Sequence, residues 1–236
     1  SLHAEKLYKL YSDPRALQDY KYLPYGPFST LDEFLTKLEL ARRDSNTLLF
    51  TVFDLALEFE DGDEGESRVE RIAGIVGVKE SRKKDRMTEI GHVHIPPQFQ
   101  RTHVTTHSLS LLLRWTLDPP SILAPHNLGL RRTQWFANPS NQASITVAQK
   151  MGFKLEAPLI RWERSLEIGK GKESLLLPRW LEGDRKRREE EIGGRYSSLL
   201  AVDWEDWEGG GREFVEELLR REVRKRNAKD VEGLMD

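Results

Sequence analysis

Residues 138–153 read NPSNQASITVAQKMGF, and this stretch decides the fold. Its Pro-Ser-Asn start favours a helix from about residue 139 to 150, because proline and small polar residues suit the first helical turn. Gly152 favours the end of that helix, since glycine adopts the left-handed conformation that often closes a helix. The flanking runs 131–137 and 154–164 predict strands. We therefore expect a strand, a helix and a second strand in succession.

Three more strands are predicted ahead of this unit, each rich in β-branched or aromatic residues. They span 47–54, 72–78 and 89–95. This order predicts an antiparallel meander that becomes parallel where a helix at 105–117 crosses over to the strand around Trp135. Strand ends that splay apart beside the start of that helix would form a slot for a ligand. The expected class is α/β (α+β), with a mixed, mostly antiparallel twisted sheet flanked by helices.

Local signals predict the segments around these strands. Thr30 and Glu33 have the spacing of a capping box, which predicts a helix over 31–43. The basic stretch 79–86 predicts a turn between two strands. The acidic stretch 58–66 predicts a solvated loop, because its carboxylates lack the spacing of a calcium loop.

The last seventy residues differ from the rest in composition. Residues 167–190 are strongly polar, and a strand is predicted at 196–202. A charged helix is predicted at 213–226. Its apolar stripe, which would pack within the chain or across a dimer, consists of Phe214, Leu218, Leu219 and Val223. We expect one domain over 1–236, with a core at 70–164, a polar insertion at 165–194, and a closing strand and helix at 195–226.

Composition excludes several classes of protein. The 37 Lys and Arg residues against 39 Asp and Glu residues give a net charge of −2, which argues against coating nucleic acid by bulk charge. The sequence has no cysteine, so disulfide scaffolds, Cys-ligated zinc and thiol nucleophiles are excluded. No apolar run is long enough to span a bilayer. We expect a cytoplasmic protein, and a chain that starts on Ser1 suggests trimming.

The stretch that leads into the 105–117 helix is suited to an anion. It reads QRTHVTT from Gln100 to Thr106. The first backbone N–H groups of a helix lack partners within the helix, and the helix dipole is positive at that end. A phosphate is therefore the favoured ligand of this turn.

Residues 70–164 resemble the acetyl-CoA-binding core of the GNAT N-acetyltransferase superfamily, and are most similar to its ribosomal-protein (RimJ/RimL-like) branch. The matching segments are 89–92, 100–102, 131–135, and, as the most specific, 138–144 with 150–153. The segments 22–28 and 195–207 also resemble this branch, although the first strand usual in the superfamily has no counterpart here. The resemblance implies the GNAT fold and an acetyl-CoA-dependent N-acetyltransferase.

The resemblance also implies how acetyl-CoA binds. The pantetheine arm would pair like a strand beside His94 and Ile95. The pyrophosphate would lie on the turn formed by Gln100, Arg101, Thr102, His103, Val104, Thr105 and Thr106. His103 and Thr105 stand where the family has two small residues. We expect the side chains of Arg101 and the threonines to replace the lost backbone contacts, whereas the alternative leaves Arg101 as an ordinary surface residue.

Asn141 and Ser144 lie three apart and share a helix face. On the simpler interpretation, Asn141 caps the helix and Ser144 is an ordinary first-turn residue. The resemblance instead places Asn141 against the pantetheine arm. It places Ser144 near the sulfur of CoA, where its hydroxyl can protonate the leaving thiolate.

The strand at 89–95 carries the candidate bases. The resemblance makes Glu89 the group that removes a proton from the attacking amine, and the alternative is a structural carboxylate paired with an arginine. His92 and His94 share one face and could act as relay bases. A His-x-His pair alone is a weak zinc signal, so no metal is expected. The Gly-x-Ser-x-Gly motif of serine hydrolases is absent.

The acceptor is expected to be a small-molecule or peptide amine. The resemblance places its slot between the N-terminal helices and the connection of the last two strands. Aromatic residues that could line this slot, or belong to the core, are Tyr22, Tyr25, Phe28, Trp162 and Trp180. The alternative function is a degenerate GNAT-like interaction module that binds CoA weakly. We expect a monomer or homodimer without nucleic-acid or membrane partners.

Overall fold

The computed structural model describes residues 3–58, 71–165, 194–227 and 231. Its helices are α1 (Ala4–Tyr11), the 3-10 helix η1 (Pro14–Tyr22), α2 (Leu31–Arg43), the 3-10 helix η3 (Pro97–Phe99), α3 (His103–Leu117), α4 (Gln142–Lys150), α6 (Trp204–Asp206), the π-helical turn η5 (Trp207–Gly211) and α7 (Arg212–Arg220). Its strands are β1 (Leu48–Phe53), β2 (Leu57–Glu58), β3 (Ile72–Arg82), β4 (Met87–His94), β5 (Arg132–Ala137), β6 (Lys154–Ser165), β7 (Gly194–Asp203) and β8 (Arg226–Asn227). The polar stretch 167–190 and Trp180 lie outside the described residues.

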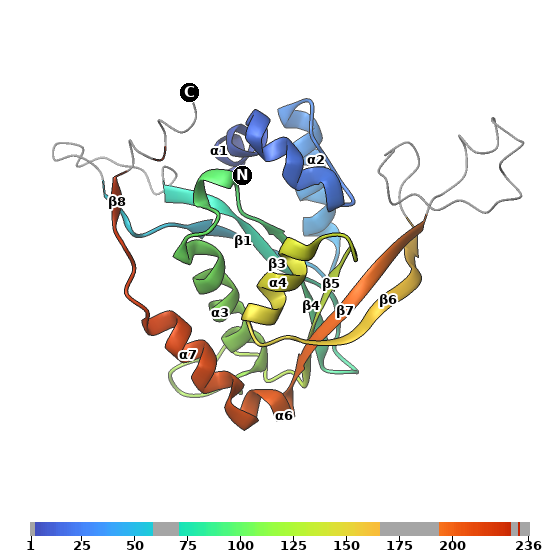
Figure 1. Ribbon diagram of the computed structural model, residues 1–236, viewed down its shortest axis with the longest axis vertical. Coiled ribbons are helices and arrows are strands. Elements are labelled where there is room, and N and C mark those ends of the chain that lie inside the picture. Colours follow the sequence, from blue (N-terminus) through green and yellow to red (C-terminus); the bar gives the residue numbers. More distant parts are fainter. Residues whose placement is uncertain (1–2, 59–70, 166–193, 228–230, 232–236) are drawn as a thin grey trace, which may run out of the picture.

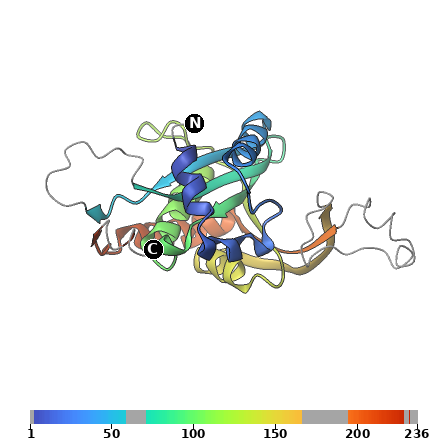
Figure 2. The same cartoon turned by 90° about the horizontal axis from the view of Figure 1, so that it is seen from above.

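A six-stranded sheet runs through the molecule in the order β1-β3-β4-β5-β7-β6. Strands β4 and β5 are parallel, and the other neighbouring pairs are antiparallel. This confirms the predicted meander and the crossover through α3. Helices α1 and α2 lie on one face of the sheet, and α3 and α7 lie on the other (Figures 1 and 2).

Helix starts follow the capping signals of the sequence. The Thr30 hydroxyl accepts a hydrogen bond from the Glu33 amide at 3.2 Å, and the Glu33 carboxylate accepts one from the Ser29 amide at 2.7 Å. Helix α3 begins at His103 rather than at the expected residue 105, because the Thr102 hydroxyl caps it. Helix α4 begins at Gln142, later than expected from its Pro-Ser-Asn start.

Two other boundaries and the buried face of α7 differ from the prediction. Strand β3 continues to Arg82, so the expected turn 79–86 shortens to the few residues before β4. Helix α7 ends at Arg220, and residues 221–225 of the expected helix have no regular structure. Arg226 begins β8, which pairs with β2. In α7, Val215 and Leu218 are buried, whereas Phe214 of the expected stripe is 38% exposed. Helix α7 packs against α3. The periodicity alone did not specify that Val215 would belong to its buried face.

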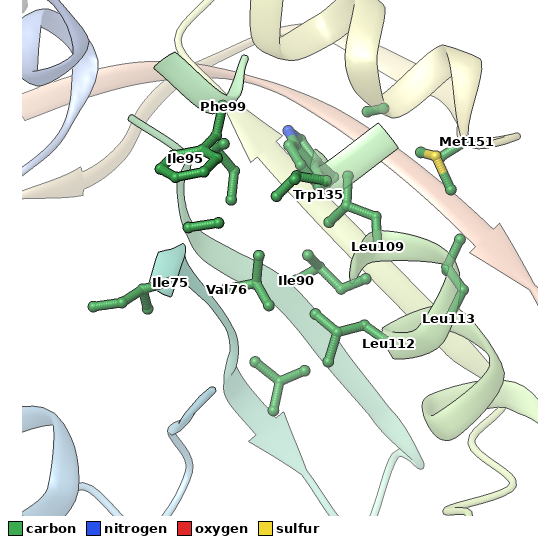
Figure 3. Packing of buried hydrophobic residues seen from close by; sticks show 14 of the residues in the cluster. Ile75, Val76, Ile90, Ile95, Phe99, Leu109, Leu112, Leu113, Trp135 and Met151 are labelled. Carbon is green, nitrogen blue, oxygen red and sulfur yellow. The ribbon is translucent and has the colours of Figure 1, made fainter. Parts of the chain in front are cut away.

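The core lies on both faces of the sheet, because residues of α1, η1 and α2 belong to the same buried cluster as residues of α3 and α4. Val76 and Ile90 of neighbouring strands meet Leu109 and Leu112 of α3 (Figure 3). Ile75 points away from this group and lies on the side of α1 and α2 (Figure 3). No helix in the described part of the chain is long and apolar enough to cross a membrane.

Candidate active site

Strands β4 and β5 pair only over their first three residues and then separate. The last pair is Glu89 with Gln134, although β4 continues to His94. Against β3, the three residues from Ile75 to Gly77 face the four residues from Gly91 to His94, so β4 carries a bulge there. His92 sits in this bulge at φ +51°. The predicted separation of the two strands is therefore present, and Glu89 is the last residue of β4 that pairs with β5.

Glu89 is 3% exposed and lies between two cations. Its Oε1 is 2.9 Å from the Lys79 ammonium, and its Oε2 is 3.5 Å from the Arg164 guanidinium. Burial raises the pKa of Glu89, and the two cations oppose this shift. The same burial lowers the pKa of Lys79. The arginine partner of the structural interpretation is thus present, and the role of Glu89 as a base stays a prediction.

A second carboxylate stands beside this group. The Glu163 side chain is 2.7 Å from the Arg164 Nε, and it accepts a hydrogen bond from the Ser197 hydroxyl at 3.0 Å. Arg195 donates to the same hydroxyl at 3.1 Å. Contact with Arg164 and Arg195 lowers the pKa of Glu163 against the effect of burial. The pKa of Glu163 is therefore shifted in the opposite direction to that of Glu89, and Glu163 stays ionised.

A pocket opens on the α1 and α2 side of β4. The empty space at this pocket, which includes open solvent at its mouth, is about 370 Å³. Aromatic and aliphatic side chains form most of its wall, which is completed by one lysine and two histidines. The wall consists of Tyr11, Tyr25, Phe28, Phe34, Lys37, Leu38, Ala41, Leu49, Ile75, His92 and His94. Of the aromatic residues predicted for the acceptor slot, Tyr25 and Phe28 reach this pocket, whereas Trp162 is 45% exposed elsewhere.

The two histidines of β4 both face the pocket, as their alternation predicted. Burial, together with the nearby cations Lys79, Lys37 and Arg164, lowers the pKa of His92 to about 4, and Asp44 weakly opposes this shift. His92 is therefore neutral at pH 7. Lys79 and Arg164 are also the partners of Glu89, so the Glu89 cluster and the pocket share one electrostatic environment.

His94 and Ile95 are the residues beside which the pantetheine arm is predicted to pair. The His94 ring stacks on Tyr11 with 3.9 Å between centroids, and its backbone oxygen accepts a hydrogen bond from the Tyr11 hydroxyl at 2.9 Å. The Ile95 oxygen accepts one from the Gln100 side chain at 2.9 Å. Both carbonyls are thus engaged within the chain. A pantetheine arm would use backbone N–H groups or the second lone pair of these oxygens.

The predicted phosphate turn is a tight connection between η3 and α3. Arg101 is exposed and adopts φ +57°, a left-handed conformation that is uncommon for a residue other than glycine. The Thr102 hydroxyl donates to the Phe99 oxygen at 2.6 Å and accepts from the Val104 amide at 3.2 Å. The Val104 side chain is buried, so it offers a ligand no contact. Gln100 also binds Asp19 of η1, at 3.1 and 3.2 Å from its two oxygens.

His103 does not project freely from this turn. Its Nε2 lies 3.1 Å from Oδ1 of Asp54, which is fully buried directly after β1. Oδ2 of Asp54 lies 2.5 Å from the Arg226 guanidinium, which also donates to the Gln98 oxygen at 3.2 Å. Sequence reasoning missed Asp54 and Arg226, because they meet only through the pairing of β2 with β8. The large His103 side chain, which stands where the family has a small residue, therefore points into the protein.

On the other side of the slot, α4 presents Asn141 and Ser144. The Asn141 side-chain oxygen accepts a hydrogen bond from the Ser144 amide at 3.1 Å, which confirms the capping interpretation. The Ser144 hydroxyl accepts one from the indole N–H of Trp135 at 3.0 Å. No group of three or more potential metal ligands occurs among the described residues.

The acetyltransferase (GNAT) domain model matches residues 1–154. The chain belongs to the GNAT acetyltransferase family. This places it among acyltransferase enzymes, and its mixed sheet flanked by helices agrees with the fold of solved GNAT structures. A search of curated protein sequences finds no match.

Solved GNAT structures resemble the chain over most of its length. A GCN5-related N-acetyltransferase from Brucella melitensis has a TM-score of 0.68 and 20% identity, with 100% of this chain and 87% of that chain covered. A probable acetyltransferase of the GNAT family from Chromobacterium violaceum has a TM-score of 0.62 and 24% identity, with 87% of this chain and 80% of that chain covered. A spermidine N-acetyltransferase from Vibrio cholerae, solved with CoA and spermine, has a TM-score of 0.54 and 13% identity, with 86% of this chain and 91% of that chain covered.

Proposed function

We propose that this GNAT enzyme transfers the acetyl group of acetyl-CoA directly to the nitrogen of a primary amine. The observation that carries the proposal is the separation of β4 from β5 just beyond Glu89, with α4 on one side and the pocket on the other. When bound, acetyl-CoA supplies an activated acetyl thioester. Direct transfer is favoured because the sequence has no cysteine to carry an acyl group.

Glu89 is the proposed general base. An amine is mostly protonated at pH 7 and must lose a proton before it can attack a carbonyl. Burial raises the pKa of Glu89, which makes its carboxylate a stronger base than an exposed one. Because Glu89 is deeply buried, we propose that the proton reaches it through a water molecule. Lys79 and Arg164 orient the carboxylate and stabilise its ionised form.

Ser144 is the proposed general acid for the leaving thiolate. The indole N–H of Trp135 can only donate a hydrogen bond, so the Ser144 oxygen accepts it. The hydroxyl proton of Ser144 is then directed to another acceptor. Asn141 uses its side-chain oxygen as the cap, which leaves its amide N–H₂ for the pantetheine arm.

The turn before α3 fits a pyrophosphate in charge and position. Arg101 is exposed beside the start of α3, and Thr105 and Thr106 are partly exposed in its first turn. We propose that these side chains supply phosphate contacts, while His103 is held by Asp54. Replacement Arg101→Ala should weaken acetyl-CoA binding, as measured by calorimetry. Unchanged affinity would leave Arg101 as a surface residue.

The experiment that tests the function is an acetyl-CoA-dependent thiol-release assay with a panel of primary amines. Mass spectrometry of the products should show an added acetyl group on nitrogen. Thiol release without an acetylated amine, or no release with any amine, would contradict the proposal.

One observation favours the alternative of a GNAT-like binding module. Side chains already bind the carbonyls of His94 and Ile95, and Thr102 caps the amide of Val104. A module that had lost the ability to bind acetyl-CoA would keep these contacts, and acetyl-CoA would not bind to it. We favour the enzyme, and we propose that it belongs to the RimJ/RimL-like branch. We further propose that it is a cytoplasmic monomer or homodimer.

A further inference from the structure

The turn before α3 has a conformation that its own side chains do not favour. Arg101 lies in the left-handed region at φ +57°, which is uncommon for a residue other than glycine. The hydroxyl of Thr102 donates to the Phe99 oxygen and accepts from the Val104 amide, so both of these hydrogen bonds stay within the turn. They cap the helix, but they do not connect the turn to the rest of the molecule.

One such connection comes from β8, which lies beside β2 near the end of the chain (Figure 1). The Arg226 guanidinium lies 2.5 Å from Oδ2 of Asp54, and it donates to the Gln98 oxygen at 3.2 Å. It also lies 5.5 Å from the ring centroid of Phe99. Gln98 and Phe99 belong to η3, directly before the turn. Arg226 therefore holds the segment that enters the turn.

Asp54 holds the segment that leaves the turn. Its Oδ1 lies 3.1 Å from Nε2 of His103, the first residue of α3. Asp54 is fully buried and fixed in place, because its side chain accepts from the Ala56 amide at 2.9 Å and its own amide donates to the Arg71 oxygen at 2.8 Å. Arg226 and Asp54 thus bind each other and act on both ends of the turn from inside the protein.

A second carboxylate, that of Asp19 in η1, also lies near the turn. The Gln100 side chain binds both of its oxygens, at 3.1 and 3.2 Å, and Oδ2 of Asp19 lies 3.7 Å from Nε2 of His94. Asp19 therefore connects the start of the turn to η1 through contacts that do not involve Arg226. Replacement of Arg226 leaves this connection in place, so we expect the turn to be loosened rather than lost.

We propose that Arg226 and Asp54 are positioning residues for acetyl-CoA, which hold the turn before α3 in the shape that receives the pyrophosphate. Because the turn is assigned to the pyrophosphate, this inference rests on the proposed function. A turn that already has its bound shape loses little conformational freedom when the ligand binds. If only a fraction of the molecules has that shape, the apparent dissociation constant rises in inverse proportion to the fraction. Arg226 and Asp54 lie outside the Glu89 cluster, so kcat at saturating acetyl-CoA should not change.

The test compares two acetyl donors with the variant Arg226→Met. Calorimetry should show a Kd for acetyl-CoA that is about tenfold higher, which corresponds to a turn with the bound shape in roughly a tenth of the molecules. In the thiol-release assay the KM for acetyl-CoA should rise while kcat stays the same. S-acetylpantetheine has the thioester but neither pyrophosphate nor nucleotide, and its kcat/KM should be the same in both proteins. Equal losses with both donors would overturn the inference.

The matched control is Arg212→Met, at the other end of α3. The Arg212 guanidinium also contacts an aspartate and an aromatic ring, with its Nε 2.8 Å from Asp118 and its carbon 6.0 Å from the ring centroid of Trp207. Its loss should lower stability, as measured by urea denaturation, but leave the Kd for acetyl-CoA unchanged. Equal rises in Kd in the two variants would show that lost stability, rather than the shape of the turn, weakens binding.

Arg226→Lys separates position from charge and serves as the second variant if Arg226→Met does not fold. Lysine keeps the positive charge but lacks the planar fork whose two nitrogens bind Asp54 and the Gln98 oxygen. We expect a smaller rise in the Kd for acetyl-CoA than with methionine. An unchanged Kd in Arg226→Lys would show that Arg226 supplies only charge, and would overturn its role in positioning.

The outcomes distinguish this inference from the proposed function. If the unaltered chain binds acetyl-CoA and acetylates an amine, but the Arg226 variants bind acetyl-CoA equally well, the inference is wrong and the enzyme function stands. If the unaltered chain does not use S-acetylpantetheine, the Kd values of the Arg226 and Arg212 variants decide between the outcomes. If the unaltered chain neither binds acetyl-CoA nor acetylates any amine, the proposed function and the inference are contradicted together.

Discussion

Two buried carboxylates occupy comparable positions in this molecule, each between two basic side chains. Asp54 lies at the start of α3 between His103 and Arg226. Glu89 lies where β4 and β5 separate, between Lys79 and Arg164. Asp54 also accepts a hydrogen bond from the Ala56 amide at 2.9 Å. Glu89 instead adjoins the cluster that borders the pocket.

The difference shows that an ion pair by itself does not reveal a role. The partners of Asp54 come from the start of α3 and from β8, so this carboxylate connects the turn before α3 to the end of the chain. The partners of Glu89 also lower the pKa of His92 in the pocket wall. We therefore expect Asp54 to determine stability and Glu89 to determine rate, and the following variants test that division.

The largest effect is expected at Glu89. Glu89→Gln should lower kcat by roughly 10²–10⁴-fold, because it removes the proposed base. The matched control is Glu163→Gln, which changes a neighbouring carboxylate that contacts the same Arg164. Steady-state kinetics of both variants measure the two values of kcat. Equal losses of kcat would show that the rate depends on the charge cluster as a whole and not on Glu89 as a base.

The next effect tests the far side of the slot. Ser144→Ala should lower kcat by about 10²-fold and leave the KM for acetyl-CoA unchanged, because a general acid acts in the chemical step. Ser140→Ala, in the exposed turn before α4, serves as the control. A rise in KM with unchanged kcat would instead assign Ser144 to cofactor binding.

The Asp54 side should respond in stability. Arg226→Met leaves a fully buried carboxylate without its arginine, and should lower the free energy of unfolding by about 3 kcal/mol. Lys225→Met is the control, since its ion pair with Glu58 is exposed and such pairs contribute at most about 1 kcal/mol. Urea denaturation measures both. If kcat falls in the Arg226 variant at a temperature where it stays folded, the division between the two carboxylates is wrong.

The last effect is a gradual pH dependence of stability from His92. Its pKa is about 4 in the folded chain and near the ordinary 6.5 when unfolded. As the pH falls from 6.5 to 4, the unfolded chain binds a proton that the folded chain does not, so stability decreases. The slope reaches about 1.4 kcal/mol per pH unit. Urea denaturation between pH 4 and 7 should show a smaller slope in His92→Gln, whereas His126→Gln in an exposed loop should not change it.

The sequence predicted the parts of this fold that depend on local signals. Gly152 ends α4 with φ +92°, as its position required, and the Thr30 cap starts α2. The crossover from β4 to β5 followed from the order of the strands. The bulge at His92 was not predicted, because it depends on the register between β3 and β4.

The parts of the site that arise from distant residues could not be read from the sequence. Asp54 and Arg226 lie 172 positions apart and meet through β2 and β8. The cation between Glu89 and Glu163 comes from β6, on the far edge of the sheet. Glu89 and Ser144 were found through resemblance, and their proposed roles stay predictions.

The most direct test of this account is the thermal unfolding of the full chain with and without acetyl-CoA. Binding to the folded state at 100 times the dissociation constant should stabilise it by about 2.7 kcal/mol. For a chain of this size, that corresponds to a rise in the unfolding midpoint of roughly 5–10 °C. Free acetate at the same concentration should produce no such rise. No shift at millimolar acetyl-CoA would contradict the proposed acetyltransferase and favour the binding module.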